Sequence, residues 1–152
     1  MKGVLIAAPS SGSGKTVITL ALLRALKRSG HTVGSLKIGP DYIDPGFHSL
    51  ASGAACLNID GWAMRPSTRA GQIARIAEDI ELMIAEGVMG LFDGAADGTG
   101  SSADLAADFN LPIILIVDVS GQSASAAAVV TGFKEFRADI KIAGVIFNRV
   151  GS

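Results

Sequence analysis

The chain of 152 residues is long enough to form one domain with a substantial buried core. Its 13 basic and 14 acidic residues give a net charge of −1, which argues against general nucleic-acid binding, and its apolar runs are too short to cross a membrane. The single cysteine, Cys56, excludes an internal disulfide and a multi-cysteine metal site, so we expect a cytoplasmic protein.

The first predicted element is a short apolar strand over residues 3–8, which runs into a loop of small residues ending in Gly14-Lys15-Thr16. Small residues let a chain wrap so that its backbone N–H groups point at phosphate oxygens. Lys15 would then reach the β- and γ-phosphates of a nucleotide, and the Thr16 hydroxyl would bind Mg²⁺. A helix predicted over residues 15–29 adds its N-terminal dipole to the same site. The predicted phosphate-binding residues are Ser11, Gly12, Ser13, Gly14, Lys15, Thr16 and Val17.

One position departs from the usual form of this loop. The strict pattern has a glycine where this chain has Pro9, so the first bend of the loop must be made differently. The strand before the loop and the helix after it still favour a phosphate site over a flexible Gly/Ser linker.

Strands and helices alternate along the rest of the chain. Further strands are predicted over residues 32–38, 80–85, 112–117 and 142–147, and further helices over residues 68–77, 102–109 and 123–136. This alternation, with an apolar fraction of 49%, indicates an α/β fold. We predict a P-loop NTPase-like, three-layer α/β/α domain with a mostly parallel central sheet. Ligands of such sheets bind beyond the carboxyl ends of the strands, where the candidate functional residues fall.

Two carboxylates follow the second predicted strand, in the segment 37–45 with the sequence KIGPDYIDP. Mg²⁺ prefers one or two carboxylates together with waters and phosphate oxygens, so Asp41 and Asp44 are candidate metal and substrate residues. The alternative is structural, because Asp41 suits the cap of a turn and Asp44 the N-cap of a helix that begins at Pro45. Lys37 would neutralise a transferring phosphoryl group or hold a substrate carboxylate, unless it is merely an exposed lysine at a strand end.

Glu86 comes at the end of the third predicted strand. An acid at the end of the strand next to a phosphate loop is well placed to bind Mg²⁺ or to position water. The alternative is a solvated charge at the end of a strand. Asp93 stays open between a site residue and a turn, because Asp93-Gly94 is a common turn pair.

Four further side chains give weaker signals. Asn148 follows the last strand, and its amide offers both a donor and an acceptor to the edge of an adenine base. His31 and His48 have no partner spacing typical of a metal site, and no Cys–His pair has local support for nucleophilic catalysis. We interpret Trp62 as packing or as the anchor of a substrate loop rather than as a base-stacking residue.

Five segments of the chain, taken together, resemble the cobyrinic acid a,c-diamide synthases, within the dethiobiotin-synthetase-like group of P-loop amidoligases. They follow one another over nearly the whole chain, and Pro9 is then a variant that the family itself uses. The segments are 8–16, 37–45 with Phe47-His48, Asn58-Ile59-Asp60, 86–94 and 147–150.

The resemblance implies an enzyme that uses ATP to phosphorylate a carboxylate of a corrin-ring precursor, after which ammonia displaces the phosphate to give an amide. It implies that Thr16, Asp44 and Glu86 surround Mg²⁺, with Asp41 essential in the same acidic cluster. Phosphoryl transfer needs positioning and charge neutralisation more than covalent help from the protein, which agrees with these residue types.

The resemblance also gives roles to three residues outside the metal set. Lys15 would hold the phosphates, Lys37 would steady the phosphoryl group or the acyl phosphate, and Asn148 would read the adenine. The candidate catalytic set is therefore Lys15, Lys37, Asp41, Asp44 and Glu86.

Members of this family continue into a C-terminal glutaminase domain that uses a cysteine nucleophile. This sequence ends at Ser152, and Cys56 lies in no glutaminase-like context. We therefore expect residues 1–152 to form an ATP-binding synthetase domain, incomplete at its C-terminus, that takes ammonia from a glutaminase domain not in this chain. The expected partner is a corrinoid small molecule, with no nucleic acid and no membrane, and a homodimer is a candidate assembly.

Three alternatives stay open. An ATP-driven switch of the chromosome- or septum-positioning type has a similar fold, but its loop carries a lysine near the start, where this chain has Ser10. Dethiobiotin synthetase performs the same chemistry on a carbamate, and the segment 39–45 disfavours it. The third alternative is a nucleotide-binding fragment without turnover.

Overall fold

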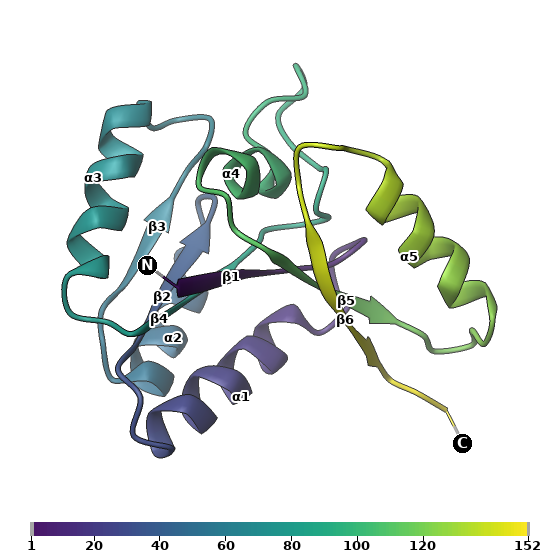
Figure 1. The fold of residues 1–152 in the computed structure, drawn as a ribbon, viewed down its shortest axis with the longest axis horizontal. Helices are drawn as coiled ribbons and strands as arrows, with labels where there is room; N and C mark the ends of the chain where they lie inside the picture. The colour runs from purple at the N-terminus through teal and green to yellow at the C-terminus, as the bar shows by residue number, and fades with distance from the viewer. Residues whose placement is uncertain (1, 152) are drawn as a thin grey trace.

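Six short segments, most of them strongly apolar, form one sheet, and β-branched and aliphatic side chains dominate them because they pack well on a pleated surface. The computed structural model describes residues 2–151, and every strand pairing within them is parallel (Figure 1). The strand order is β3-β2-β4-β1-β5-β6. The strands are β1 (Lys2–Ala7), β2 (Val33–Ile38), β3 (Cys56–Ile59), β4 (Leu82–Glu86), β5 (Ile113–Asp118) and β6 (Ile142–Asn148).

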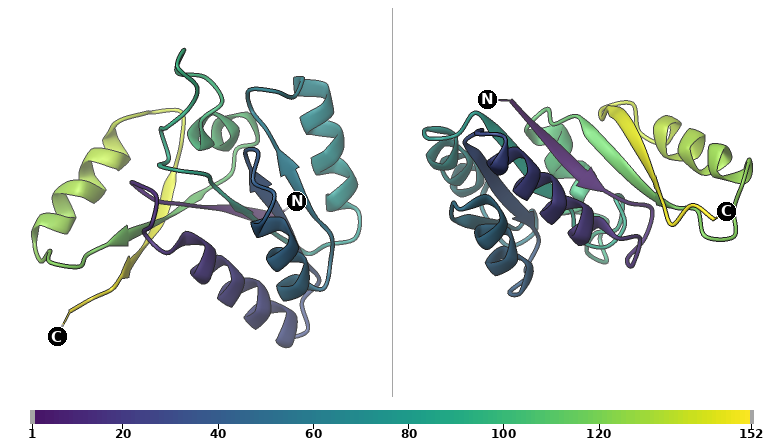
Figure 2. Two further views of the ribbon diagram at one scale, coloured as in Figure 1. Left: turned by 180° about the vertical axis from the view of Figure 1, so that it is seen from behind. Right: turned by 90° about the horizontal axis from the view of Figure 1, so that it is seen from below.

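Helices cover both faces of this sheet, as Figures 1 and 2 show. They are α1 (Lys15–Arg28), α2 (Asp44–Ser52), α3 (Pro66–Ala77), α4 (Ser102–Asp108) and α5 (Ser125–Glu135). Leu23 of α1 belongs to a core cluster on one face, against which α2 also packs. Ile73 of α3, Leu105 of α4 and Ala126 of α5 belong to a second cluster on the opposite face. The predicted three-layer α/β/α fold is therefore confirmed.

The sequence prediction of five strands and four helices missed β3, and it considered α2 only as the alternative helix that begins at Pro45, without an end. The segment that forms α2 contains Pro45, Gly46 and two serines, which are poor helix formers. Its helix is stabilised by packing against α1, β2 and β3. The four residues of β3 show no clear alternation and no long apolar run, so periodicity gave no signal.

The register of the central strands aligns the ends that carry the polar residues. Glu86, the last residue of β4, lies opposite Ile6 of β1 on one side and opposite Lys37 of β2 on the other. Lys37 in turn lies opposite Asn58 of β3. The loops that follow β1, β2 and β4 therefore start at the same level, where ligands of parallel sheets bind.

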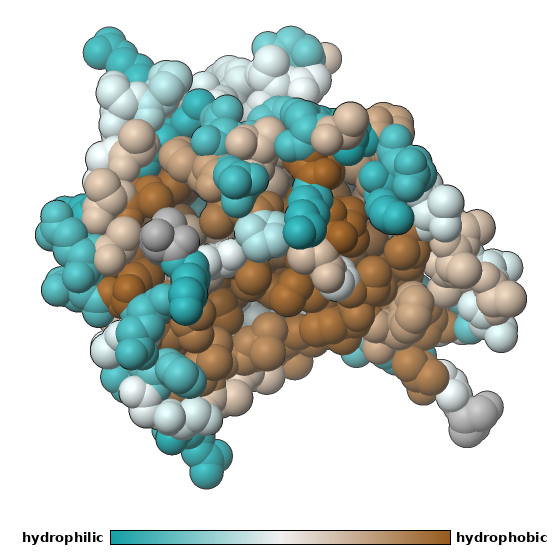
Figure 3. All heavy atoms as spheres, viewed as in Figure 1, coloured by the Kyte–Doolittle hydropathy of each residue, from teal (hydrophilic) through white to brown (hydrophobic). Residues whose placement is uncertain are grey.

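Apolar surface gathers across the middle of the face seen in Figure 3, with hydrophilic side chains around it. Within residues 2–151, none of the helices combines the length and the apolar content that crossing a bilayer requires. Residues 39–44, which follow β2 and carry Asp41 and Asp44, are called the acidic loop. Large apolar side chains are exposed close to this loop and to the phosphate loop, among them Val17, Tyr42, Ile43 and Phe47.

The short helix α4 begins with a reciprocal cap. The Ser101 hydroxyl accepts a hydrogen bond from the Asp104 N–H (3.1 Å), and the Asp104 carboxylate accepts one from the Ser101 N–H (3.0 Å). Arg137, which follows α5, donates to the same carboxylate at 2.6 Å. Partial burial raises the pKa of Asp104, but the hydrogen bonds from Arg137 and Ser101 outweigh it and hold that pKa below its usual range.

We expect Asp104→Asn to lower the free energy of unfolding at neutral pH by about 1 kcal/mol or less, because the ion pair is partly exposed. The pKa of Asp104 is lower in the folded state than the unfolded value of about 3.9. Its stabilisation is therefore present above that pH and is lost as the pH falls through the folded-state pKa. Urea denaturation at about pH 7 and about pH 3 measures both effects.

The control is Asp79→Asn, which changes an exposed carboxylate outside any ion pair described in the structure. It should leave the free energy of unfolding unchanged at both pH values. A deficit of Asp104→Asn that stayed the same at low pH would contradict this account of the cap.

Candidate functional site

The phosphate loop joins β1 to α1 and has the backbone geometry that an anion site needs. Gly12 and Gly14 have φ angles of 79° and 94°, in the left-handed region that favours glycine. Gly14 is the N-cap of α1, and no side chain caps that helix. The first N–H groups of α1 therefore remain free to meet a phosphate group.

Lys15 reaches from the phosphate loop to the segment that follows β4. Its side chain is buried, and its Nζ donates to the carbonyl oxygens of Met89 (2.7 Å) and Ser10 (3.3 Å). Burial lowers the pKa of Lys15, and the nearby charge of Glu86 opposes that shift. Met89 has a φ of 51°, where a residue other than glycine is strained. The Lys15 ammonium is thus held by neutral acceptors that an incoming phosphate could replace.

Four of the predicted residues meet at the carboxyl ends of β2 and β4. The Lys37 Nζ lies 2.5 Å from Asp44 Oδ2 and 2.9 Å from Glu86 Oε1. The Thr16 Oγ1 lies 2.6 Å from the same Glu86 oxygen and 3.1 Å from the same Asp44 oxygen. A fifth, Asp41, lies further out, with its Oδ2 3.4 Å from the Lys37 Nζ. We call these five residues the acidic cluster.

Lys37 and Glu86 form a buried ion pair, with exposed fractions of 3% and 0%. Burial lowers the pKa of Lys37, but the hydrogen bond to Asp44 and the charge of Glu86 outweigh it and raise that pKa. Burial raises the pKa of Glu86, but hydrogen bonds from His48 and Thr16 outweigh it and hold that pKa below its usual range. The alternative interpretation of Lys37 and Glu86 as solvated charges at strand ends is therefore wrong.

Asp41, not Asp44, caps the first turn of α2. The Asp41 Oδ1 accepts hydrogen bonds from the N–H groups of Ile43 (2.9 Å) and Asp44 (3.0 Å). The N-cap position itself is Ile43, and Asp44 is the first residue of the helix. The alternative prediction of Asp44 as the N-cap is thus wrong, and its carboxylate is left for Lys37 and Thr16. Burial raises the pKa of Asp41, but the two backbone donors outweigh it and lower that pKa.

Strand β3 holds the loop that carries these aspartates. The Asn58 Nδ2 donates to the carbonyl oxygens of Gly39 (2.9 Å) and Asp41 (2.7 Å). The Gly39 N–H donates in turn to the Ile59 carbonyl at 2.8 Å. Gly39 has a φ of 86°, and a Cβ there would lie 2.8 Å from Val88. The turn after β2 therefore needs glycine both for its conformation and for its contact with the loop after β4.

Sequence reasoning missed His48 as part of the site. The His48 side chain on α2 is fully buried, and its Nε2 lies 2.7 Å from Glu86 Oε2. Its Nδ1 lies 3.7 Å from the Sγ of Cys56 on β3, a Cys–His contact that the sequence analysis did not anticipate. Burial lowers the pKa of His48, but the hydrogen bonds to Cys56 and Glu86 outweigh it and raise that pKa to about 9.

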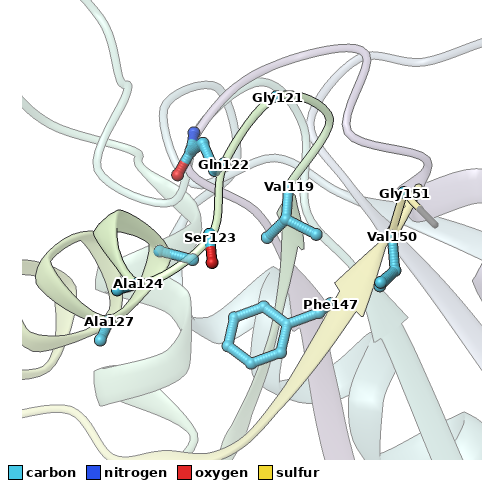
Figure 4. Close-up of a pocket in the computed structure, with 10 residues that line it drawn as sticks. Val119, Gly121, Gln122, Ser123, Ala124, Ala127, Phe147, Val150 and Gly151 are labelled. Carbon is cyan, nitrogen blue, oxygen red and sulfur yellow. The ribbon is translucent and has the colours of Figure 1, made fainter.

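Asn148 ends β6 and lies against the phosphate loop. Its Nδ2 donates to the Ser13 carbonyl at 2.9 Å, and a Cβ on Gly14 would lie 2.3 Å from that nitrogen. Beside it, a cavity of about 770 Å³ opens at the carboxyl ends of β5 and β6 (Figure 4). Val119 and Phe147 point into this cavity. Asn148 thus contacts the phosphate loop, and its neighbour in β6, Phe147, lines the cavity.

Asp93 and Trp62 lie at the outer edge of the site. The Asp93 Oδ2 accepts a hydrogen bond from the Gly90 N–H at 2.9 Å, so its side chain closes a turn. Trp62 has an exposed fraction of 69%, which argues against packing and leaves the anchor of a substrate loop as the remaining interpretation. A cavity of about 230 Å³ lies between Trp62, Asp93 and Pro40.

The predicted metal ligands fit Mg²⁺ by the chemistry of their donor atoms. Thr16, Asp44 and Glu86 bring one hydroxyl and two carboxylates together, and Mg²⁺ takes such oxygen ligands with waters and phosphate oxygens. In this structure the Lys37 ammonium lies between the two carboxylates and neutralises part of their charge. Across residues 2–151, no group of three or more His, Cys, Asp or Glu side chains is arranged to hold a metal ion.

A family model described as the CobQ/CobB/MinD/ParA nucleotide binding domain matches residues 4–152. The chain belongs to this family. It is 59% identical, over its whole length, to the hydrogenobyrinate a,c-diamide synthase of Brucella anthropi, and 57% identical to that of Rhizobium meliloti. It spans 35% of the length of each of these curated relatives. The predicted resemblance to this group of synthases is thereby confirmed.

Among solved structures, chloroplast FtsY from Physcomitrella patens matches with a TM-score of 0.64. The match covers 96% of this chain and 49% of the FtsY chain, at 16% sequence identity. This likeness shows the fold alone.

We expect Gly14→Ala to destabilise the protein more than Gly12→Ala. Both variants place a Cβ at a positive φ, which costs about 1–2 kcal/mol. Only the Cβ at position 14 meets Asn148, whereas nothing lies within 4 Å of one at position 12. The clash should add about 1–3 kcal/mol, which urea denaturation of the two variants measures.

A double variant, Gly14→Ala with Asn148→Ala, tests the cause of that difference. Removing the Asn148 amide removes the clash, so the double variant should lose less stability than the sum of its single variants. Equal destabilisation by Gly12→Ala and Gly14→Ala, or strict additivity in the double variant, would contradict the contact.

Proposed function

We propose that this domain uses ATP and Mg²⁺ to activate the a and c carboxylates of hydrogenobyrinate, or of the related cobyrinic acid, for amidation. The observation that carries the proposal is the convergence of Lys15, Lys37 and the oxygen set of Thr16, Asp44 and Glu86 beside a phosphate loop. The names of the relatives supply the substrate class.

The reaction has two steps. A carboxylate oxygen of the substrate attacks the γ-phosphorus of ATP, the bond to the β–γ bridging oxygen breaks, and an acyl phosphate and ADP form. Ammonia then attacks the acyl carbon, phosphate leaves with the bonding pair, and the nitrogen loses a proton to give the amide. Neither step needs a covalent bond to the protein, so its task is to position the groups and neutralise charge.

The two lysines would divide this task. Lys15 would exchange its carbonyl partners for the β- and γ-phosphate oxygens. Lys37 has three N–H donors, of which Asp44 and Glu86 use two in the structure. It can therefore turn an N–H toward the transferring phosphoryl group while it stays paired with a carboxylate. Its raised pKa keeps it charged at neutral pH for this purpose.

Thr16, Asp44 and Glu86 would hold Mg²⁺, which, when bound, neutralises phosphate charge. Asp41 would position Asp44, because its carboxylate accepts a hydrogen bond from the Asp44 N–H and so fixes the first turn of α2. Asp41 also lies within 3.4 Å of Lys37 and adds to the negative potential around it.

The nucleotide base would lie toward the cavity at the ends of β5 and β6. Its wall includes Phe147 and Val119, which suit the faces of a purine (Figure 4). Asn148, the next residue along β6, contacts the phosphate loop through the Ser13 carbonyl. The Asn148 amide uses Nδ2 on the Ser13 carbonyl and retains Oδ1 for the base edge.

Exposed aromatic side chains beside the acidic loop support a large ring substrate. Tyr42 and Phe47 are 93% and 52% exposed, and Trp62 faces the smaller cavity near Pro40. Such apolar surface next to a charged cluster is typical of a binding surface. A corrin precursor presents a broad apolar ring with carboxylates at its rim, which matches this combination.

We further propose that residues 1–152 form the ATP-binding part of the enzyme and that ammonia comes from a glutaminase domain outside these residues. The support is the resemblance of the five segments, together with the 35% of the length of the curated relatives that the chain spans. The family also includes positioning-type switches. Ser10 in the phosphate loop and the names of the relatives argue against that alternative for this chain.

The test is amidation of hydrogenobyrinate by the protein that carries this domain, with ATP, Mg²⁺ and free ammonia. We expect Asp44→Asn and Glu86→Gln each to reduce the rate by about 10²-fold or more, because each removes a charge that positions the transferring group. Asp79→Asn is the matched exposed control and should retain full activity. A substrate labelled with ¹⁸O in its carboxylates should transfer one ¹⁸O to the released phosphate.

Full turnover by either variant would exclude that residue from the reaction. Amide formation without transfer of ¹⁸O to phosphate would exclude the acyl phosphate. ATP binding without any amide, in a protein that contains an ammonia source, would favour the nucleotide-binding module without turnover.

A further inference from the structure

We propose that His48 is a positioning residue that orients the Glu86 carboxylate toward the metal and phosphate side of the site. The inference rests on the proposed function, in which Glu86 is a Mg²⁺ ligand. It assigns a task to a buried histidine that touches neither nucleotide nor substrate in that function.

The two oxygens of Glu86 have separate partners. Oε2 lies 2.7 Å from the His48 Nε2, whereas Oε1 lies 2.6 Å from the Thr16 Oγ1 and 2.9 Å from the Lys37 Nζ. Both Glu86 and His48 have exposed fractions of 0%. Because the last torsion of a glutamate is soft, a carboxylate needs partners on both oxygens to stay in one orientation. His48 therefore keeps Oε1 facing Thr16 and Lys37.

The His48 ring is itself held by α2 and β3. Its Nδ1 lies 3.7 Å from the Cys56 Sγ. The Cys56 N–H donates to the Ser49 hydroxyl at 3.0 Å, and that hydroxyl donates to the Pro45 carbonyl at 2.8 Å. Residues 48 and 49 are thus tied to the start of β3. A histidine whose one ring nitrogen is fixed presents the other in a defined direction.

Helix α2 links two of the three carboxylates of the acidic cluster, those of Asp44 and Glu86. Asp44 and His48 are four residues apart, so they lie on the same face of the helix. The first contributes its own carboxylate, and the second holds the carboxylate of Glu86 from the neighbouring β4. Helix α2 therefore sets the distance between two predicted metal ligands.

The chain offers a matched control in its other histidine. His31 Nδ1 lies 3.4 Å from Glu81 Oε2, but these side chains have exposed fractions of 48% and 61%. The pair has the same chemistry without burial and lies away from the phosphate loop.

The first experiment measures Mn²⁺ affinity by electron paramagnetic resonance, in the protein saturated with a non-hydrolysable ATP analogue. We expect His48→Leu to weaken Mn²⁺ binding by about 10–100-fold, the usual effect of losing a group that orients a metal ligand. His48→Gln should stay within about threefold of the unaltered protein, because its amide N–H can reach the same carboxylate oxygen. His31→Leu should bind Mn²⁺ normally, and all variants should bind the analogue equally without metal.

The outcomes distinguish a failure of the proposed metal site from a failure of the positioning role of His48. If the unaltered protein binds no Mn²⁺ with the analogue, the proposed metal site fails. If it binds Mn²⁺ and His48→Leu binds it equally well, the positioning role of His48 fails. Equal weakening in His48→Leu and His48→Gln would also overturn that role, since it would indicate packing rather than a hydrogen bond to Glu86.

A second measurement needs no variant at position 48. In protein labelled with ¹⁵N-histidine, the His48 Nε2 should carry a proton, and its resonance should show a strong hydrogen bond. His31→Gln assigns the two histidines by removing one set of signals. A His48 Nε2 without a proton would overturn the proposal, because it could then not donate to Glu86.

Discussion

The buried ion pair between Lys37 and Glu86 is the interaction on which the rest of the site depends. A buried carboxylate or ammonium is costly unless every charge and lone pair finds a partner. Here Glu86 is satisfied by Lys37, Thr16 and His48, and Lys37 also contacts Asp44. The three partners of Glu86 come from β2, α1 and α2, so the charge balance of the site requires these elements to be in place together.

That balance follows from strand register. Lys37 on β2 and Glu86 on β4 are directly opposite in a parallel pair, and Ile6, the residue before the end of β1, lies opposite Glu86 on the other side. A one-residue slip would turn every side chain of a strand to the other face of the sheet. The apolar residues on both faces of β1 and β4 therefore fix the polar geometry at their ends, since they pack in cores that such a slip would disrupt. The packing that fixes the strand register therefore also fixes the positions of the polar residues in the site.

The sequence was sufficient wherever the signal is local. The phosphate loop is a contiguous motif, and Asp41, Asp44 and Glu86 follow apolar strands, so their convergence could be predicted from the topology of parallel sheets. It was insufficient where contacts join distant segments. His48 meets Glu86 and Cys56 only because α2 and β3 pack there, and both elements lack strong periodicity. Likewise, the side chain that caps the first turn of α2 is that of Asp41 and not that of Asp44, and only the geometry of the turn decides between the two.

We propose that Mg²⁺ replaces part of the lysine contacts of the acidic cluster when a nucleotide binds. A crystal structure of the protein with Mg²⁺ and a non-hydrolysable ATP analogue tests this most directly. We expect Mg²⁺ bound to the Thr16 hydroxyl and to a carboxylate oxygen of Glu86 or Asp44, with the Lys37 ammonium turned toward the γ-phosphate. A metal ion bound only to phosphates and water, with Lys37 still between both carboxylates, would contradict it.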